Sequence, residues 1–323
     1  MSTMLGFGNA SWWMFESFKH YNMTPLIKHH NAQIGISFVP PHEYSFGAEH
    51  QYKIGYTPWE STGLQAGWLE NMQACDEIWA TNRWNKEIYE SYLDKEVFVY
   101  NHGIDHRFSP KRRKYFSHQP FTFLYVGEPF NRKNGQLVYD TFTKLYGNDD
   151  RYKLVIKCTK MPDHPEHTIK VVEVPNSNHE PYYKNVIFIT KMLSVEDLID
   201  LYGSSHCFLY PSLGEGFGFN PFQAMAMGIP TICTAGWADY ANYITLPLEA
   251  ELGQSPWQDI HPGLQFIPSS AQFEEHMKNV VQNYDKYATI AFRNSFKLHE
   301  DYDWLTVTKP AIEKIKKIAK SRI

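Results

Sequence analysis

Hydrophobic positions along the first third of the chain form short runs that alternate with segments of helical periodicity. The short runs predict strands at Ile34–Val39, Tyr52–Tyr56, Glu77–Ala80 and Val97–Tyr100. Apolar residues at helical spacing predict helices at Ser11–His20, Gln65–Ala74 and Asn85–Tyr92. Strands that alternate with helices in this way are typical of an α/β fold with parallel sheets.

A second α/β series follows a polar, basic segment, His102–Pro120, which we interpret as the region of an interdomain linker. Its predicted strands are Phe121–Val126, Tyr152–Lys157, Val186–Ile189, Cys207–Tyr210 and Thr231–Cys233. Its predicted helices are Gln136–Leu145, Val195–Tyr202, Pro221–Met227 and Ala271–Tyr284, followed by one or two helices after Asp301. The pattern therefore predicts two α/β domains, which fits a length of 323 residues.

Composition narrows the classes of function. A net charge of −4 excludes a surface that attracts nucleic acid or anionic lipid as a whole. The four cysteines are scattered and form no CxxC pair, so we expect neither a disulfide scaffold nor a zinc site, and a reducing, cytoplasmic setting. We see no signal peptide and no apolar run long enough to span a membrane. The aromatic content of 16% suits core packing and also stacking on sugars or bases.

Two glycine-containing turns carry the candidate chemistry. The segment Pro211–Thr234, "PSLGEGFGFNPFQAMAMGIPTICT", leads from a strand into a helix, and Glu215 stands among its glycines. Amide groups at such a helix start bind anions, although the glycines alone favour an ordinary tight turn. The segment Val126–Gly135, "VGEPFNRKNG", adds Arg132 and Lys133, which are either ligands of a diphosphate or a solvated basic pair.

These segments together resemble retaining glycosyltransferases of the GT-B fold, that is, glycosyl transferases group 1 of the family 4 type, related to glycogen and sucrose synthases. Pro211–Thr234 is similar to their signature "PS..EGFG...lEAMa.G.Pvi". "YTPWES", "VYNHGIDHRFSP", "FLYVGEPFNRKNG" and "LSVEDLIDLYGSSHCFLYPS" agree with the family in the same order. The resemblance implies two Rossmann-like domains that face each other across a cleft, with a C-terminal helix that crosses back to the first domain.

The domain limits that follow are an N-terminal acceptor-binding domain at 1–110, a linker at 111–120 and a nucleotide-sugar-binding domain at 121–298. Residues 299–323 would then form the helix that packs on the first domain. The resemblance further implies a nucleotide-sugar donor (a UDP-sugar is favoured), retention at the anomeric carbon, no cofactor and no obligatory metal.

The resemblance also implies roles for residues of the second domain. Arg132 and Lys133 would hold the diphosphate, and Glu215 would accept hydrogen bonds from hydroxyls of the donor sugar. The other donor-binding residues would be Gly127, Glu128, Lys191, Met192, Leu193, Ser212, Gly216, Phe217, Gly218, Phe219 and Gln223, with the base near Lys191–Leu193. Two positions depart from the family pattern: Gln223 replaces the acid that grips the ribose, and Glu128 replaces a frequent arginine.

Candidates in the first domain come with alternatives. Gly8 and Asn9 lie in Gly6–Ser11, which is either a turn that approaches the donor phosphates or a simple turn. His42 follows a predicted strand where the family often has a catalytic histidine, although most histidines cap or pack. Glu60 and Trp59 are candidates for acceptor binding. Trp12, Trp13 and Trp68 are further stacking candidates or core residues.

The acceptor leaves three hypotheses open. A saccharide or glycoconjugate hydroxyl is the first. The second is a 5-hydroxymethylated pyrimidine in DNA, as in viral DNA-modifying enzymes, with the basic run Arg107–Phe116 as the docking patch and the host cytoplasm as the location. A solvated linker is the alternative interpretation of that run, and it is the one that we favour. The third is a protein or a small metabolite. A hypothesis of a different class is a non-catalytic relative that binds glycans or nucleotides, which the departures at Glu128 and Gln223 suggest.

Overall fold

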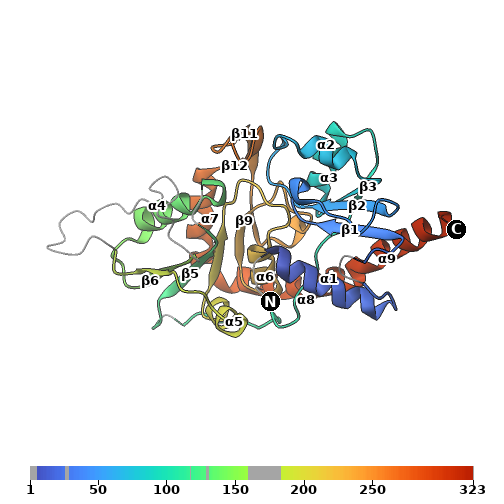
Figure 1. Ribbon diagram of the computed structural model, residues 1–323. Helices are drawn as coiled ribbons and strands as arrows, with labels where there is room; N and C mark the ends of the chain where they lie inside the picture. The colour runs from blue at the N-terminus through green and yellow to red at the C-terminus, as the bar shows by residue number, and fades with distance from the viewer. Residues whose placement is uncertain (1–5, 26–28, 117, 129–130, 159–182, 323) are drawn as a thin grey trace.

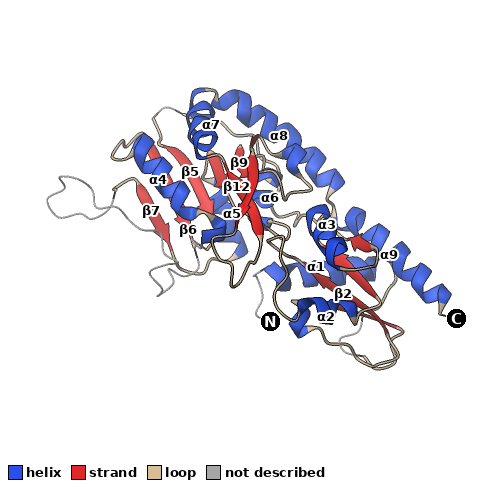
Figure 2. Cartoon of the chain, turned by 90° about the horizontal axis from the view of Figure 1, so that it is seen from above, coloured by secondary structure: helices blue, strands red, loops and turns tan. Residues whose placement is uncertain are grey.

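The computed structural model describes residues 6–25, 29–116, 118–128, 131–158 and 183–322, and within them the chain forms two α/β domains, each built on a parallel sheet (Figure 1). The two sheets lie side by side when the molecule is seen from above (Figure 2). A fold with two domains of this kind, and with a C-terminal helix that returns to the first, is the predicted architecture.

The first domain contains a four-stranded sheet in which all neighbours are parallel, in the order β1-β2-β3-β4. Its elements are α1 (Gly6–His20), β1 (Ile34–Phe38), the 3-10 helix η1 (Pro41–Glu43), β2 (Tyr52–Thr57), α2 (Trp68–Gln73), β3 (Glu77–Ala80), α3 (Arg83–Tyr92) and β4 (Val97–Val99). β3 is wholly buried and so are the last four residues of β2, which is typical of central strands in a parallel sheet.

The second domain contains a six-stranded parallel sheet in the order β10-β9-β8-β5-β6-β7, and a separate antiparallel hairpin, β11-β12. Its first elements are β5 (Phe121–Val126), η2 (Asn131–Lys133), α4 (Gly135–Tyr146), β6 (Tyr152–Lys157), β7 (Val186–Ile189), α5 (Val195–Gly203), β8 (Cys207–Tyr210) and α6 (Phe219–Ala226). The later ones are β9 (Thr231–Thr234), η4 (Ala241–Tyr243), β10 (Leu246–Leu248), β11 (Ala250–Gln254), β12 (Leu264–Pro268), α7 (Ser270–Gln282), α8 (Tyr284–Asp301) and α9 (Trp304–Ser321).

The last helix completes the core of the first domain. α9 runs beside α1 and extends along the first domain in Figure 1. Its apolar face, Ala311, Ile312, Ile315 and Ile318, is buried together with first-domain residues Phe18, Ile54, Tyr56, Trp79 and Tyr100. Burial of these side chains stabilises the crossing, at about 25 cal/mol for each Å² of apolar surface removed from water.

Several predicted boundaries are wrong. Gly6–Ser11 is not a turn but the start of α1, because Ala10, Ser17 and Phe18 lie on a buried helical stripe. The predicted C-terminal unit at 299–323 begins inside α8, and the crossing helix starts only after Asp303, whose side chain accepts hydrogen bonds from the backbone N–H groups of Leu305 and Thr306. The sequence patterns also missed β10, β11, β12 and α8.

Candidate active site

A cavity of about 380 Å³ lies between the two domains, at the carboxyl ends of strands of both sheets. The sequence-predicted residues that line it are Asn9, Glu60, Gly127, Glu128, Arg132, Lys133, Met192, Leu193, Glu215, Gly216, Phe217, Gly218, Phe219 and Gln223. The structure therefore brings most of the candidate residues to one place, although their distances in sequence are large.

Five predicted residues do not line the cavity: Gly8, His42, Trp59, Lys191 and Ser212. Ser212 lies beneath the cavity wall and donates a hydrogen bond to Glu215. Lys191 is exposed in the loop before α5, and Gly8 lies in the first turn of α1. Trp59 is buried in the core, where its ring packs against Trp68 and its indole N–H donates to the Gly63 carbonyl at 2.7 Å. Trp59 and Trp68 are thus core residues, whereas Trp12 remains 52% exposed on α1.

His42 lies outside the cavity, and the structure gives its predicted catalytic role no support. Its side chain is about half exposed on η1. Its Nδ1 atom accepts a hydrogen bond from the indole N–H of Trp68 at 3.1 Å, and its Nε2 atom lies 3.5 Å from Glu43 Oε1. The 3-10 turn after β1 directs this side chain toward α2 rather than toward the second domain.

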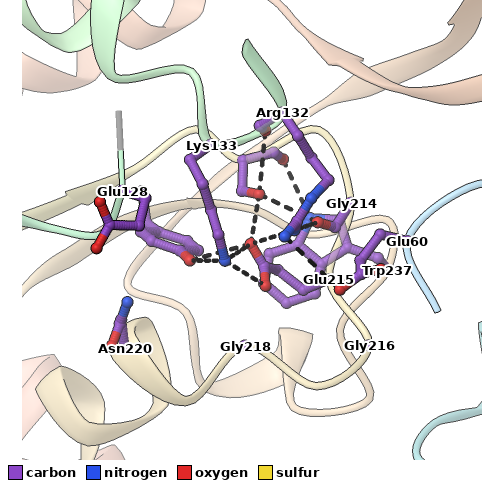
Figure 3. A network of polar contacts seen from close by, with 12 residues as sticks. Glu60, Glu128, Arg132, Lys133, Gly214, Glu215, Gly216, Gly218, Asn220 and Trp237 are labelled. Carbon is purple, nitrogen blue, oxygen red and sulfur yellow. Dashed lines mark hydrogen bonds and ion pairs between the residues drawn. The ribbon is translucent and has the colours of Figure 1, made fainter. Parts of the chain in front are cut away.

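The centre of the site is the carboxylate of Glu215, toward which Lys133 and Arg132 point (Figure 3). Lys133 Nζ donates to both Glu215 oxygens at 2.7 Å, and Arg132 Nη1 lies 3.1 Å from Oε1. Ser212 Oγ and Tyr210 OH donate to the same Oε1 at 2.6 and 3.0 Å. Acid and cations, which the sequence analysis assigned to different parts of a donor, are thus bonded to one another.

The charges in this cluster are stabilised against burial by their mutual contacts. Burial alone would raise the pKa of Glu215, but Lys133 and Arg132 hold that pKa at about 2, so the carboxylate is ionised. Burial would lower the pKa of Arg132, yet Glu215 and Glu60 raise that pKa above its usual value. Burial lowers the pKa of Lys133, and Glu215 opposes the effect. The cluster therefore presents ordered cations to the cavity.

Glu60 is contributed by the first domain, and its Oε1 lies 3.6 Å from Arg132 Nη2. Its Oε2 lies 3.8 Å from Nδ1 of the buried His261, whose pKa burial lowers to about 3. Because Arg132 contacts both carboxylates, the charged cluster spans the two domains.

The glycines beside Glu215 serve contact between the domains. A Cβ atom at Gly214 would overlap the Glu60 carbonyl, and one at Gly216 would overlap Pro58. The Gly216 carbonyl accepts hydrogen bonds from the side chains of Thr81 and Asn82 of the first domain. For these two glycines the tight-packing interpretation holds, since no larger residue fits against the neighbouring loop.

Gly218 has a different task, because it adopts the left-handed conformation (φ +81°) as the N-cap of α6. Its carbonyl accepts a hydrogen bond from Tyr240 OH at 2.7 Å, which fixes the start of the helix on the cavity wall. The N-terminal end of α6 therefore faces the cavity with a partial positive charge.

Several lining residues were missed by the sequence analysis. His102 is buried between aromatic rings, stacked on Phe219 at a centroid distance of 5.1 Å, and burial lowers its pKa to about 3. Lys157, at the end of β6, is a further buried cation, and its only sequence signal is a charge that closes an apolar run. Glu128, which was predicted, lines the cavity as expected, and its carboxylate points away from Glu215 in Figure 3. Asp105 and Arg107 are two further lining residues that the sequence patterns did not single out.

The basic segment after β4 is partly used inside the protein. Arg107 forms a two-point ion pair with Asp105, and Arg113 donates to the carbonyls of Gly203 and Ser205. Arg113 is thus turned away from the predicted DNA-docking patch, whereas Arg107, although paired with Asp105, stays exposed together with Lys111, Arg112 and Lys114.

Among the described residues, no group of three or more His, Cys, Asp or Glu side chains is arranged to hold a metal ion. The four cysteines are buried and unpaired. No helix within the described ranges is long and apolar enough to cross a membrane.

Comparison with known proteins gives a family match for part of the chain and a similarity of fold. Residues 108–246 match the family described as "Glycosyl transferases group 1". The chain is 26% identical over 194 residues to a putative glycosyltransferase of Sulfolobus islandicus filamentous virus, a match that covers 59% of this chain and 49% of the viral protein. The chain thus spans about half the length of this relative.

Two solved structures show the similarity of fold. Sucrose-phosphate synthase from Thermosynechococcus elongatus superposes with a TM-score of 0.65 at 13% identity, over 98% of this chain and 79% of that one. The pneumococcal O-GlcNAc transferase GtfA, in complex with UDP and GlcNAc, gives a TM-score of 0.55 at 13% identity, over 84% of this chain and 53% of that one. The predicted GT-B architecture is confirmed.

Proposed function

We propose that the protein is a retaining glycosyltransferase that moves a sugar from a nucleotide-sugar donor to a hydroxyl group of a saccharide or glycoconjugate. The observation that carries this proposal is the charged cluster of Arg132, Lys133 and Glu215 on the wall of an interdomain cavity in a GT-B fold. The match of residues 108–246 to glycosyl transferases group 1 supports it.

The cations and the helix start would bind the diphosphate of the donor. Lys133, Arg132 and the N-terminal end of α6 face the same cavity, and each attracts negative charge. As the bond between the anomeric carbon and the diphosphate breaks, charge develops on the leaving oxygen, and these groups stabilise it. Because Glu215 already orders both cations, little reorganisation is needed when the donor enters.

Glu215 would bind the transferred sugar through one of its oxygens. Its Oε1 atom contacts Ser212, Tyr210, Lys133 and Arg132, whereas Oε2 accepts only from Lys133 among the described contacts. A carboxylate oxygen has two acceptor positions, so Oε2 retains one for a sugar hydroxyl. The carboxylate thereby links the sugar to the cations that hold its phosphate.

The reaction replaces one bond on the anomeric carbon by another on the same face. The bond to the diphosphate oxygen breaks, the acceptor oxygen bonds to that carbon, and the acceptor proton passes to the departing diphosphate. No separate protein base is required, which agrees with His102 being neutral and enclosed by aromatic rings. Asn9 and Glu60, which reach the cavity from the first domain, are our candidates for contact with the acceptor.

A UDP-sugar is the favoured donor, and it is treated as substrate, with no cofactor or metal in the proposed reaction. GtfA, whose fold is similar, was crystallised with UDP and GlcNAc. No observation specifically favours hydroxymethylated DNA as acceptor, and Arg113, one cation of the predicted patch, donates its hydrogen bonds inside the protein.

The test is nucleotide release from a panel of sugar nucleotides, with saccharide acceptors or with hydroxymethylated DNA. We expect release that rises with a saccharide, and a product whose anomeric configuration by NMR equals that of the donor. Lys133→Met is expected to abolish release, whereas Lys317→Met, an exposed site on α9, leaves it unchanged. Inversion would overturn the mechanism, DNA-dependent release would overturn the acceptor class, and absence of donor binding would indicate a non-catalytic relative.

A further inference from the structure

The cavity continues from the cation cluster to a group of side chains with a different character. Met192, Leu193, Val195 and Leu198, from the start of α5 and the loop before it, line this part. The segment after β4 contributes Asp105, Arg107 and Phe108. The mixture of apolar side chains with one ion pair differs from the charged wall at Arg132 and Lys133.

The orientation of the Arg107 guanidinium is fixed by the carboxylate of Asp105, two residues earlier in the chain. The Asp105 side chain is 4% exposed, and its Oδ1 accepts from both the backbone N–H and Nε of Arg107 at 3.0 Å. Its Oδ2 accepts from Nη2 at 2.6 Å. A guanidinium bound at two points cannot rotate, so its plane is set before any ligand arrives.

Among the described residues, one nitrogen of this guanidinium makes no hydrogen bond, and it is left for a ligand. Nη1 of Arg107 lies 3.7 Å from Glu196 Oε1, which is beyond hydrogen-bond distance. The Arg107 side chain is 45% exposed and lines the cavity, so a bound molecule has access to it.

The apolar side chains suit a flat base, and an arginine only donates hydrogen bonds. It therefore pairs with a ring carbonyl and not with an amino group. Uracil carries an oxygen where cytosine carries an amino group, and guanine carries an oxygen where adenine carries an amino group. We propose that Arg107, oriented by Asp105, reads the base of the donor and selects nucleotides with a keto base, uridine or guanosine, over those with an amino base. This inference rests on the proposed function, since it assumes a nucleoside diphosphate in this cavity.

The test is calorimetric titration of the full chain with UDP, CDP, GDP, ADP and inorganic pyrophosphate. We expect at least one keto nucleotide to bind about tenfold or more tightly than its amino counterpart. Arg107→Met should bring that ratio close to one and leave pyrophosphate affinity within about twofold, since the loss concerns the base alone. Arg112→Met, an exposed cation of the same segment, is the matched control and should change neither quantity.

Asp105→Asn tests the positioning role separately. It keeps Arg107 but weakens the two-point pair, so the ratio should fall while pyrophosphate binding persists. Arg107→Lys, which preserves the charge, covers the case in which the methionine variant fails to fold, and it should also reduce the ratio because an ammonium lacks the planar donor pair.

The outcomes separate this inference from the proposed function. The inference is wrong if the wild type binds UDP as tightly as CDP and GDP as tightly as ADP. It is also wrong if a preference for the keto nucleotide survives in Arg107→Met. In both cases the glycosyltransferase proposal stands. If Arg107→Met weakens pyrophosphate binding in parallel, Arg107 serves the phosphates and the inference is also wrong. If the wild type binds none of these nucleotides, the proposed function itself fails.

Discussion

The replacement Glu215→Gln tests whether the charged cluster also holds the fold together. The amide keeps the size of the side chain but removes the negative charge that Lys133 and Arg132 surround. Two nearly buried cations, 16% and 13% exposed, then lose their closest counter-charge. We therefore expect a loss of stability that comes from charge and not from a cavity.

The expected loss of folding free energy in Glu215→Gln follows from the pKa shift of Glu215. The value for Glu215 falls from 4.5 to about 2 on folding, and its cause is attraction by Lys133 and Arg132 that outweighs burial. Each pH unit of such a difference is worth about 1.4 kcal/mol, so the ionised carboxylate contributes about 3 kcal/mol at neutral pH. Removal of one partner from a buried ion pair typically costs about 3–5 kcal/mol, which agrees.

The direction of the Glu215 pKa shift determines how the free energy of unfolding changes with pH. A lowered carboxylate pKa stabilises the fold fully above pH 4.5, and the contribution is lost as the pH falls toward 2. Urea unfolding of wild type and Glu215→Gln should differ by about 3 kcal/mol at neutral pH, and the gap should narrow on acidification below pH 4.5. Glu87→Gln, at an exposed site on α3, should stay within about 0.5 kcal/mol of wild type. Equal stability at neutral pH, or a gap that ignores pH, would refute the reasoning.

Three further changes test other parts of the site. Asn82→Asp keeps the N-cap of α3 but loses the amide that donates to the carbonyls of Glu215, Gly216 and Trp237. Urea unfolding should therefore show a loss of stability of about 2–4 kcal/mol. An unchanged midpoint would mean that this interdomain contact is dispensable. His102 has a pKa of about 3 when folded against 6.5 ordinarily because it is buried, so wild-type stability should fall as pH drops below 6.5, and His102→Phe should show a shallower fall between about pH 6.5 and 5; parallel curves would contradict this. His42→Ala should leave nucleotide release within about twofold, since His42 lies outside the cavity, and a tenfold loss would restore its catalytic role.

Local patterns in the sequence were sufficient for the four-stranded sheet, for the strands of the six-stranded sheet other than β10, and for the turns that carry Lys133 and Glu215. β5 and β8 are fully buried, so their apolar runs are continuous, and the turns that follow them place Lys133 and Glu215 at the same edge of one sheet. Parallel strands bring such turns together, which is why residues 82 positions apart form one cluster. The roles assigned to individual residues in binding a donor stay predictions.

Contacts between the domains could not be inferred from the sequence, because a local pattern does not show which residue of the other domain a side chain contacts. Gly214 and Gly216 look like parts of an anion-binding loop, yet the bulk they avoid belongs to Pro58 and Glu60. Arg107 was grouped with a basic run, and only the acid two residues before it hinted at an internal pair. His42 was placed correctly at the end of a strand, but the turn of η1 decides its direction.

The path of α9 has a consequence for how the protein is made. Its buried face belongs to the same core as Tyr56, Trp79 and Tyr100. On the ribosome these residues emerge about two hundred residues before the helix that covers them, which at typical rates of synthesis is a delay of roughly 10–40 s. Through that interval the first domain exposes apolar surface, whereas the six strands of the second sheet are complete once Leu248 has been made. The first domain therefore completes its core only after α9 has been made, although its strands are the first to leave the ribosome.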